Sequence, residues 1–260
     1  MKTIIQLTFP TVEIKSKIII EAGHIYTNEQ PSLEHQISAF WGSFLSKYFK
    51  EWGVETENWL FVDDYNPKFE SKPFLLDESG YKWQLKKWGF HPDEVIHEME
   101  LVGQAKDALE LLVKNDYAGE YGGKIVLRKD TILLYDSKTD KFMCSLLDAC
   151  LYLQKLKEAD GCITVLDQQY KAQQKGAITI LKKLKANTSV IFPFFYSTSK
   201  AVQHPSVDPA QVFTTPRSIP EHGPLFFVQS SLDMLVLLSK LSGSLSLNYK
   251  PVIEVSKYGI

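Results

Sequence analysis

Acidic and amide side chains stand at the ends of several apolar stretches in this 260-residue chain. The clearest example is Asp167, followed by Gln168, which comes directly after the β-branched and aliphatic run 163–166. The carboxyl ends of parallel strands meet at one edge of a sheet, so we expect these side chains to line one crevice. The full set is Glu21, Asp63, Asp64, Asp167 and Gln168. Taken alone, it predicts a nucleotide- or metabolite-binding site and no particular reaction.

Strand and helix patterns alternate along the chain and must position that crevice. Apolar runs rich in β-branched residues predict strands at 15–23, 58–67, 95–99, 162–167 and 188–195. Apolar residues at helical spacing predict helices at 33–52, with Ser32 as N-cap, from about Gly103, and at 145–159, 169–185 and 231–241. Residues 124–141 have the pattern of a hairpin with its turn at 137–140. The alternation predicts an α/β fold with a mostly parallel sheet.

The composition excludes several classes of protein. A formal net charge of -2 provides no global basic field, so any tRNA partner must meet a local patch. The three cysteines fit neither a zinc pattern nor a paired disulfide set. No apolar stretch approaches the roughly 18 residues of a membrane span, and the opening residues lack the apolar run of a signal peptide. We therefore expect a cytoplasmic protein.

Metal and cofactor signatures are also missing from the sequence. No glycine-rich phosphate loop and no dinucleotide-binding glycine fingerprint occur, so we expect no cofactor. The histidines lack the spacing of zinc ligands, so we expect no metal. We interpret five of them as loop or surface residues: His24, His91, His97, His204 and His222.

Several short motifs occur in one order along residues 15–200. A strand ending in Glu21 is followed by a helix with an embedded Gly42 and by a strand ending in Asp64. Further on come "IHEMEL" with Glu98, "SLLDAC" with Asp148, and "VLDQQYKAQQ". This order resembles the catalytic domain of class I aminoacyl-tRNA synthetases, and of arginyl-tRNA synthetase in particular. The resemblance implies a Rossmann-like, mostly parallel sheet of that type with an inserted connective region.

We expect a single synthetase-like catalytic domain over residues 1–260. Within it, the first half of the Rossmann-like fold spans 10–66, a connective insertion 67–120, the second half 121–200 and a C-terminal extension 201–260. The extension is too short for the helical anticodon-binding domain of the family, so we expect none.

The resemblance also implies roles for four residues. In arginyl-tRNA synthetases, acids at the positions of Glu98 and Asp148 face the guanidinium of arginine. Residues at the positions of Glu21 and Gln168 hold the backbone end of the amino acid. A planar guanidinium that is always charged is well matched by carboxylates in a partly dry pocket. The sequence departs from the family at Cys144, where the family has a tyrosine, which alters the pocket wall.

The two signatures that bind ATP in this family are eroded here. The residues aligned with the first are Ser32, Leu33, Glu34 and His35, so only its second histidine survives. Glu34 adds a carboxylate where the triphosphate must approach. The second signature leaves only Lys200 as a cation. The resemblance therefore implies a protein that accepts arginine already activated, as arginyl-tRNA.

That logic is the one used by tRNA-dependent cyclodipeptide synthases, which are synthetase-like proteins without anticodon domains. We therefore predict an aminoacyltransferase that uses arginyl-tRNA, and a second aminoacyl-tRNA, to make an arginine-containing cyclodipeptide. The candidate catalytic residues are His35, as general base or oxyanion donor, and Lys171, as a contact to the tRNA 3′ end. The lysines expected to bind tRNA are Lys175, Lys182, Lys183 and Lys200.

Two alternatives stay open on the sequence. One is a divergent ATP-dependent ligase that activates arginine, and the other is a noncatalytic paralogue that binds arginine, tRNA or a protein partner. The lysines after Gln168 are equally compatible with an ordinary solvated helix face. Taken singly, an acid at a strand end or on a helix is usually a solvated or capping group.

Overall fold

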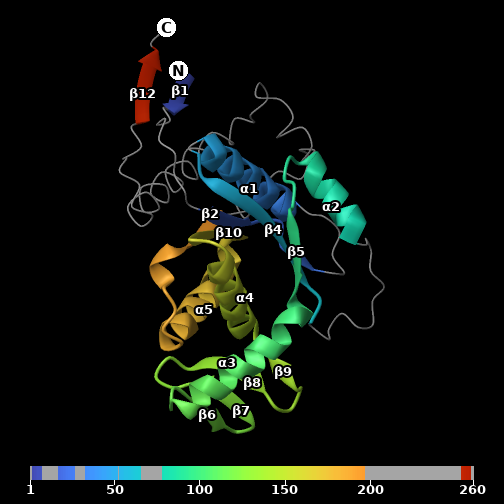
Figure 1. Ribbon diagram of the computed structural model, residues 1–260, viewed down its shortest axis with the longest axis vertical. Helices are drawn as coiled ribbons and strands as arrows, with labels where there is room; N and C mark the ends of the chain where they lie inside the picture. The colour runs from blue at the N-terminus through green and yellow to red at the C-terminus, as the bar shows by residue number, and fades with distance from the viewer. Residues whose placement is uncertain are drawn as a thin grey trace.

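The computed structural model describes residues 2–7, 17–26, 33–51, 53–65, 78–196 and 253–258 (Figure 1). Several sequence predictions lie outside these ranges: the N-cap Ser32, the cation Lys200, the loop or surface placement of His204 and His222, and the helix 231–241. Near the two ends of the chain, β1 (Lys2–Leu7) pairs antiparallel with β12 (Ile253–Tyr258). The other described elements build the α/β fold that the sequence predicts.

The central sheet is parallel throughout. Its strands are β2 (Lys17–Glu21), β3 (Ile25–Tyr26), β4 (Glu55–Asp63), β5 (Glu94–His97), β10 (Gly161–Asp167) and β11 (Ile191–Tyr196). β5 pairs with β4 at Trp59 and Val62, the residues at which β4 also pairs with β2 and with β3, respectively. Because β5 occupies one edge of β4, β2 and β3 lie one after the other along its opposite edge. The sheet is therefore five strands wide, in the order β11, β10, β2 with β3, β4, β5.

The strand order reverses between β2 and β10. From β2 the chain moves outward through β4 to β5, then returns to place β10 on the other side of β2 and continues to β11. In parallel α/β sheets, such a reversal leaves a crevice at the carboxyl ends of the two central strands, where ligands bind. Glu21 ends β2 and Asp167 ends β10, so both lie at this crevice.

Helices cover both faces of the sheet (Figure 1). One face packs against α1 (Leu33–Glu51) and α2 (Glu78–Lys87), and the other against α3 (Val102–Lys114), α4 (Cys144–Glu158) and α5 (Lys171–Lys183). Along β2, Ile18 and Ile20 join the α1 side of the core, while Ile19 joins the α4 side. Burial on both faces explains why the strands have continuous apolar runs rather than alternating ones.

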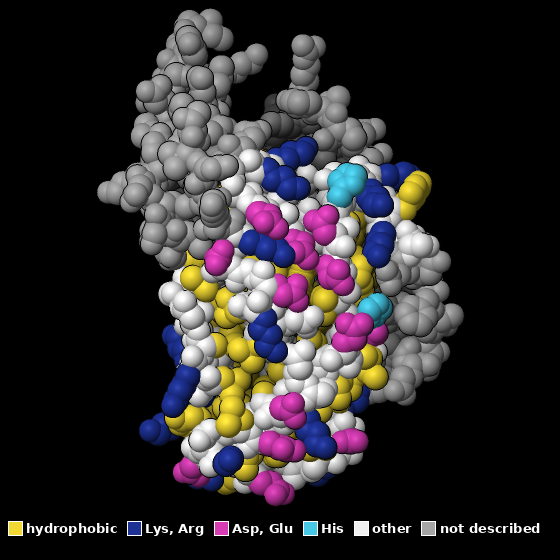
Figure 2. Space-filling view, viewed as in Figure 1, with side chains coloured by type: hydrophobic (Ala, Val, Ile, Leu, Met, Phe, Trp, Pro, Cys, Tyr) yellow, Lys and Arg dark blue, Asp and Glu magenta, His cyan; other side chains and the backbone are white. Residues whose placement is uncertain are grey.

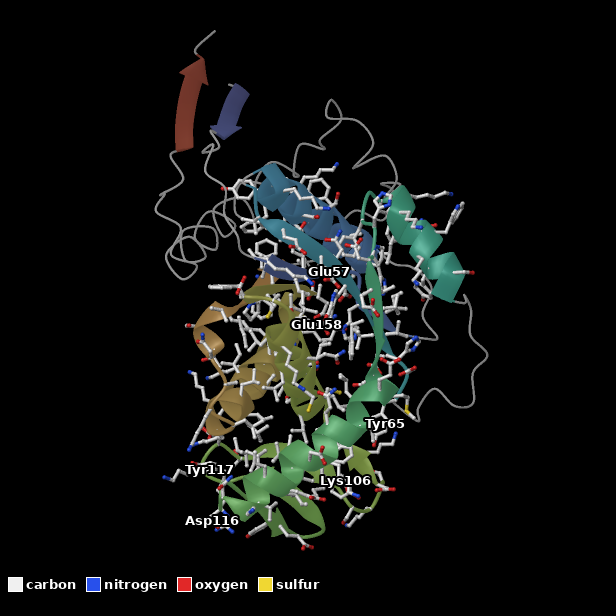
Figure 3. All side chains as sticks on the ribbon, viewed as in Figure 1. Glu57, Tyr65, Lys106, Asp116, Tyr117 and Glu158 are labelled. Carbon is white, nitrogen blue, oxygen red and sulfur yellow. The ribbon has the colours of Figure 1, made fainter. Side chains whose placement is uncertain are left out.

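A four-stranded antiparallel sheet follows α3. Its strands are β6 (Ala118–Tyr121), β7 (Lys124–Leu127), β8 (Ile132–Asp136) and β9 (Lys141–Phe142), paired in that order. The turn predicted at 137–140 joins β8 to β9. The boundary expected at residue 120, between the connective insertion and the second half of the Rossmann-like fold, falls within β6. Tyr65, labelled in Figure 3, fastens this sheet to the end of β4, because its hydroxyl donates to the Asp140 carbonyl oxygen at 3.3 Å.

Several predicted strand ends differ from the structure, and the difference at residues 95–99 bears on the site. The strand expected to reach Met99 ends at His97, and a 3-10 helix, η2 (Glu98–Leu101), follows it. Asp64 accounts for the change, since its carboxylate accepts the Met99 N–H at 3.0 Å and pairs with the His97 ring at 2.8 Å. Similar short turns precede α5, as η3 (Gln168–Tyr170), and β11, as η4 (Thr188–Val190).

Gly42 allows α1 to lie directly on β2 and its following loop. A Cβ at this position would stand 2.5 Å from the Ala22 Cβ and 2.8 Å from the Phe90 ring. Real Cβ atoms do not approach other atoms so closely, so any larger residue must push the helix away. The glycine that the resemblance marks inside this helix therefore has a packing role.

Gly42→Ala should destabilise the protein by about 1 to 3 kcal/mol, as overpacking of a dense core does. Urea unfolding followed by circular dichroism measures the change. Gly103→Ala in α3 is the matched control, because nothing lies within 4 Å of its Cβ position and alanine favours the helix. Equal midpoints for Gly42→Ala and the wild type would mean that α1 shifts away from β2 without cost.

Candidate functional site

Two small pockets adjoin at the crevice between the carboxyl ends of β2 and β10. The first, here called the acidic pocket, is lined by residues that include Glu21, Asp148, Tyr152, Thr164, Gln173 and Gln174. The second, called the histidine pocket, is lined by residues that include Glu34, His35, Ser38 and Asp167. His24, Leu166 and Tyr170 line both pockets. The site thus has two chemically different halves that share one wall.

Ser38 of α1 ties the helix to β10 and to the loop that follows β2 at this crevice. Its hydroxyl accepts the Gly23 N–H at 2.8 Å and donates to the Val165 carbonyl oxygen at 3.0 Å. Gly23 has a φ of +77°, a left-handed backbone conformation that favours glycine. Both hydrogen bonds are buried, so they hold the loop that carries His24 in a fixed position.

Lys155 of α4 makes a buried ion pair with Glu21. The Lys155 Nζ donates to Glu21 Oε2 and, at 3.0 Å, to Thr164 Oγ1. The Thr164 hydroxyl in turn donates to Glu21 Oε2 at 3.2 Å. The side chains of Lys155 and Glu21 are 1% and 4% exposed. Glu21, which the resemblance assigns to the substrate, therefore already holds a cation of the protein.

Two glutamine amides hold Asp148. The Nε2 atoms of Gln173 and Gln174 each donate to Asp148 Oδ2 at 2.7 Å. The Tyr152 hydroxyl donates to Gln174 Oε1, which fixes the orientation of that amide. Burial raises the pKa of Tyr152 well above its ordinary value, so the hydroxyl keeps its proton. The carboxylate predicted to bind the substrate is thus oriented by a chain of hydrogen bonds from α4 and α5.

Asp148 titrates near neutral pH. Burial raises its pKa to about 7, and the negative charges of Glu21 and Asp63 act in the same direction. The hydrogen bond from Gln173 and the charge of Lys155 act against this rise. A cation near a buried carboxyl group of this kind stabilises its charged form and lowers its pKa.

Glu98 shares a proton with Asp63. Burial, a hydrogen bond to Asp63 and the negative charges of Asp63 and Asp148 together raise the pKa of Glu98 to about 10. Glu98 is therefore protonated at neutral pH and donates to Asp63. The Asp63 Oδ1 atom is buried and has no hydrogen-bond partner among the described residues. Glu98 and Asp63 together therefore carry one negative charge, and Asp63 Oδ1 is an acceptor without a donor among the described residues.

Negative charge exceeds positive charge among the buried side chains, although two of the acids, Asp63 and Glu98, line neither pocket. Among the described residues, five carboxyl side chains are buried, against one lysine and no arginine. The acids are Glu21, Asp63, Glu98, Asp148 and Asp167, and the lysine is Lys155. Lys155 offsets one of these charges and the proton on Glu98 a second, and Asp167 accepts the Gln169 N–H at 2.9 Å. The surplus around Asp148 and Asp63 favours a cationic ligand.

His35 lies in the histidine pocket in its neutral form. Burial lowers its pKa to about 4, and the neighbouring His24 ring lowers it as well, against a hydrogen bond to the His24 backbone. A neutral imidazole is the form that accepts a proton in general base catalysis. His24 packs on Tyr170 with ring centroids 6.0 Å apart and meets Phe61 edge-on at 4.9 Å. His24 is a loop residue, as predicted, but its side chain lines both pockets.

Glu34 stands in the first turn of α1 and faces η3. Both of its carboxylate oxygens accept the Gln169 Nε2 N–H, each at 3.2 Å. Negative charge is favoured at the N-terminal end of a helix, where anionic ligands often bind. At the start of α1, the Glu34 carboxylate therefore occupies a position where an anionic ligand could otherwise bind.

Gln168 and the predicted basic residues lie apart from the two pockets. Gln168 is exposed in η3 and lines neither pocket. Three lysines of α5 are exposed: Lys171, Lys175 and Lys182. The Lys183 ammonium lies 5.6 Å from the centre of the Tyr117 ring, which Figure 3 labels. Figure 2 shows lysines and arginines interspersed with acids on the visible face, with no single basic field.

Sequence reasoning missed Lys155, whose charge offsets that of Glu21. Lys155 resembles its exposed neighbour Lys157 in the sequence, and only its spacing distinguishes it. It follows Tyr152 by three residues and Asp148 by seven, which puts all three on one face of α4. Asp63, which ends β4, was expected at the crevice, but its hydrogen bond with Glu98 was not.

No protein-family profile matches the sequence, and no curated protein is significantly similar to it in sequence. Solved structures do share its fold. The fold is similar to the catalytic domain of arginyl-tRNA synthetases. Arginyl-tRNA synthetase from Thermus thermophilus aligns over 93% of this chain and 60% of its own, with a TM-score of 0.56 and 12% identity.

Two further structures give the same result. Arginyl-tRNA synthetase from Plasmodium falciparum aligns over 88% of this chain and 51% of its own, with a TM-score of 0.54 and 13% identity. A protein assigned as an arginyl-tRNA synthetase from Campylobacter jejuni aligns over 70% of this chain and 55% of its own, with a TM-score of 0.56 and 12% identity. The chain thus spans between half and three-fifths of these structures.

The described residues contain neither a candidate membrane-spanning helix nor a candidate metal site. In those ranges, no helix has both the length and the apolar character that a bilayer crossing requires. Over the same part of the chain, no three His, Cys, Asp or Glu side chains are grouped as a metal site would require.

The raised pKa of Asp148 should make stability depend on pH. In the unfolded chain an aspartate has a pKa of about 4, so between about pH 4 and 7 the folded state binds the proton more tightly. This stabilising contribution is complete below the unfolded pKa and is lost as the pH rises through the folded one. Asp148→Asn removes the titration, so this variant should lose less stability than the wild type between about pH 5 and pH 8. Urea midpoints at both pH values provide the measurement, and parallel changes in the two proteins would contradict the assignment.

Proposed function

We propose that this protein is an aminoacyltransferase that uses the arginyl group of arginyl-tRNA without activating arginine by ATP. The proposed product is an arginine-containing cyclodipeptide, for which a second aminoacyl-tRNA supplies the other residue. The observation that carries this proposal is the surplus of buried carboxyl groups around Asp148, in a fold similar to arginyl-tRNA synthetases.

A guanidinium is the cation that best fits this surplus. It is always charged in proteins, presents five N–H donors in one plane and is more weakly hydrated than an ammonium. Asp63 Oδ1 is a buried acceptor in need of a donor, and the charges of Asp63 and Asp148 both act on Glu98. In our proposal Glu98 and Asp148 therefore bind the guanidinium together with Asp63. These groups carry one negative charge below about pH 7 and two above it.

Glu34 supports the part of the proposal that excludes ATP. A triphosphate entering the histidine pocket would approach a carboxylate in the first turn of α1, already held by Gln169. Like charges in a confined site repel, so this arrangement disfavours a nucleotide. An aminoacyl ester needs no such site, because the ester bond already carries the energy for peptide-bond formation.

The proposed reaction has two similar steps. The α-amine of one aminoacyl group attacks the ester carbonyl carbon of the other, a C–N bond forms, and the C–O bond to the tRNA ribose breaks. The amine loses a proton and the departing ribose oxygen gains one. A second attack within the dipeptidyl group closes the ring and releases the second tRNA. His35, neutral at pH 7, is the proposed carrier of the proton.

The exposed lysines of α5 are the proposed contacts to tRNA. Lys171, Lys175 and Lys182 follow one another at spacings of four and seven residues, so they share one face of the helix. Lys171 opens α5 just after η3 and the end of β10, which makes it the candidate nearest the crevice. Lys183 and Lys200 belong to the same proposal.

Product analysis tests this function. The protein, given arginyl-tRNA and a mixture of other aminoacyl-tRNAs without ATP, should form an arginine-containing cyclodipeptide that mass spectrometry detects. The same preparation should show no arginine-dependent ATP–pyrophosphate exchange. Robust exchange would identify an arginine-activating ligase instead. Binding of arginine or tRNA with neither activity would identify a noncatalytic paralogue.

Substitutions in the acidic cluster test the guanidinium assignment. Asp148→Asn and Asp63→Asn should each reduce use of arginyl-tRNA at least about a hundredfold, because a buried charge that loses its partner costs about 3 to 5 kcal/mol. Glu98→Gln is the matched comparison and should cost less than about tenfold. Glu98 is protonated, so a glutamine amide can replace its hydrogen bond to Asp63.

Initial rates of product formation provide the measurement, with thermal unfolding as the control for folding. If Glu98→Gln proved as damaging as Asp63→Asn, Glu98 would have to act as an ion. Wild-type rates in all three variants would remove the arginine assignment.

A further inference from the structure

We propose that Lys155 makes the acidic pocket selective for an arginyl group whose α-nitrogen carries no charge. This inference rests on the proposed function, because it assumes that the pocket binds an arginyl group. Two forms of that group qualify: one with a neutral α-amine, ready to attack an ester, and one whose α-nitrogen is already in an amide bond. Free arginine with its α-ammonium is the form that the pocket rejects.

The first support is that Glu21 has its cation already. Lys155 Nζ donates to Glu21 Oε2, and Thr164 bonds to both partners. Lys155 and Glu21 are almost completely buried, so solvent screens neither charge. Together they form a neutral unit at the end of β2.

The second support is the position of this unit in the acidic pocket. Glu21 and Thr164 line the same pocket as Asp148. An α-ammonium brought to Glu21 would come close to the Lys155 ammonium, and two like charges in a dry pocket repel strongly. An amide N–H or a neutral amine can donate to Glu21 or Thr164 without adding charge.

The pocket is therefore asymmetric in charge. The Asp148 end has surplus negative charge, whereas the Glu21 end is balanced by Lys155. A ligand that is cationic at its side chain and uncharged at its α-nitrogen matches both ends. In the proposed reaction, this makes the arginyl group the nucleophile in the first step. After that step it stays bound as the carboxyl-terminal residue of the dipeptidyl group.

Two small probes separate the forms. L-argininamide and Nα-acetyl-L-argininamide share the guanidinium and an uncharged carboxyl end, and at about pH 6, well below the pKa of an α-amine, they differ in charge at the α-nitrogen. Isothermal titration calorimetry with the full chain should show the acetylated probe binding at least about tenfold more tightly. Lys155→Met keeps the length of the side chain and removes its charge, so it should reverse this preference in favour of argininamide.

Two variants serve as controls. Glu21→Gln combined with Lys155→Met removes both charges and should abolish the preference, and it replaces Lys155→Met if that single variant does not fold. Asp148→Asn acts at the guanidinium end, so it should weaken both probes by the same factor and leave the preference intact.

The outcomes distinguish this inference from the proposed function. If the wild type bound both probes and preferred argininamide, or if the double variant kept the wild-type preference, the role of Lys155 would be refuted while an arginyl pocket stood. If the wild type bound neither probe, the acidic pocket would not take an arginyl group, and the proposed function would fall with the inference.

Discussion

The concentration of carboxyl groups in a dry interior is the constraint on which the rest of this site depends. Parallel strands bring their acidic ends together at one edge of the sheet, and each buried charge must then be stabilised. The protein does so in a different way at each acid. Glu21 has the ammonium of Lys155, Glu98 keeps a proton, and Asp148 accepts two amides. Because the partners come from α4 and α5, these helices are fixed relative to the sheet by charge as well as by apolar packing.

The sequence predicted the scaffold because its signals are local. Continuous apolar runs mark strands buried on both faces, and their carboxyl ends are visible as the acids that follow them. The order of the elements then gives a parallel sheet with Glu21 and Asp167 at one crevice. Asp148 was predicted from the family resemblance, and the structure places its buried side chain at that crevice.

The rest of the site depends on contacts between distant segments, which a single sequence does not display. Lys155 reaches Glu21 across 134 positions in the chain, and nothing near Lys155 indicates that partner. Gln168 shows the opposite case, a residue that the sequence singles out and the structure leaves outside both pockets. Asp167 accepts the Gln169 N–H and starts the turn η3, in which Gln168 is exposed. The local motif is conventional, but the turn decides which of its side chains reach the pocket.

The close contact between Gly42 and Ala22 makes the two walls of the crevice mechanically unequal. The wall formed by α1 has its backbone against the strand and is pinned again by Ser38 on both sides. The opposite wall consists of α4 and α5, joined to each other through Asp148 and two glutamines. The first wall is thus held largely by close packing, which does not respond to pH, whereas the second is held by charged and hydrogen-bonded side chains. Protonation of Asp148 therefore bears on the wall formed by α4 and α5 and leaves the α1 wall unaffected.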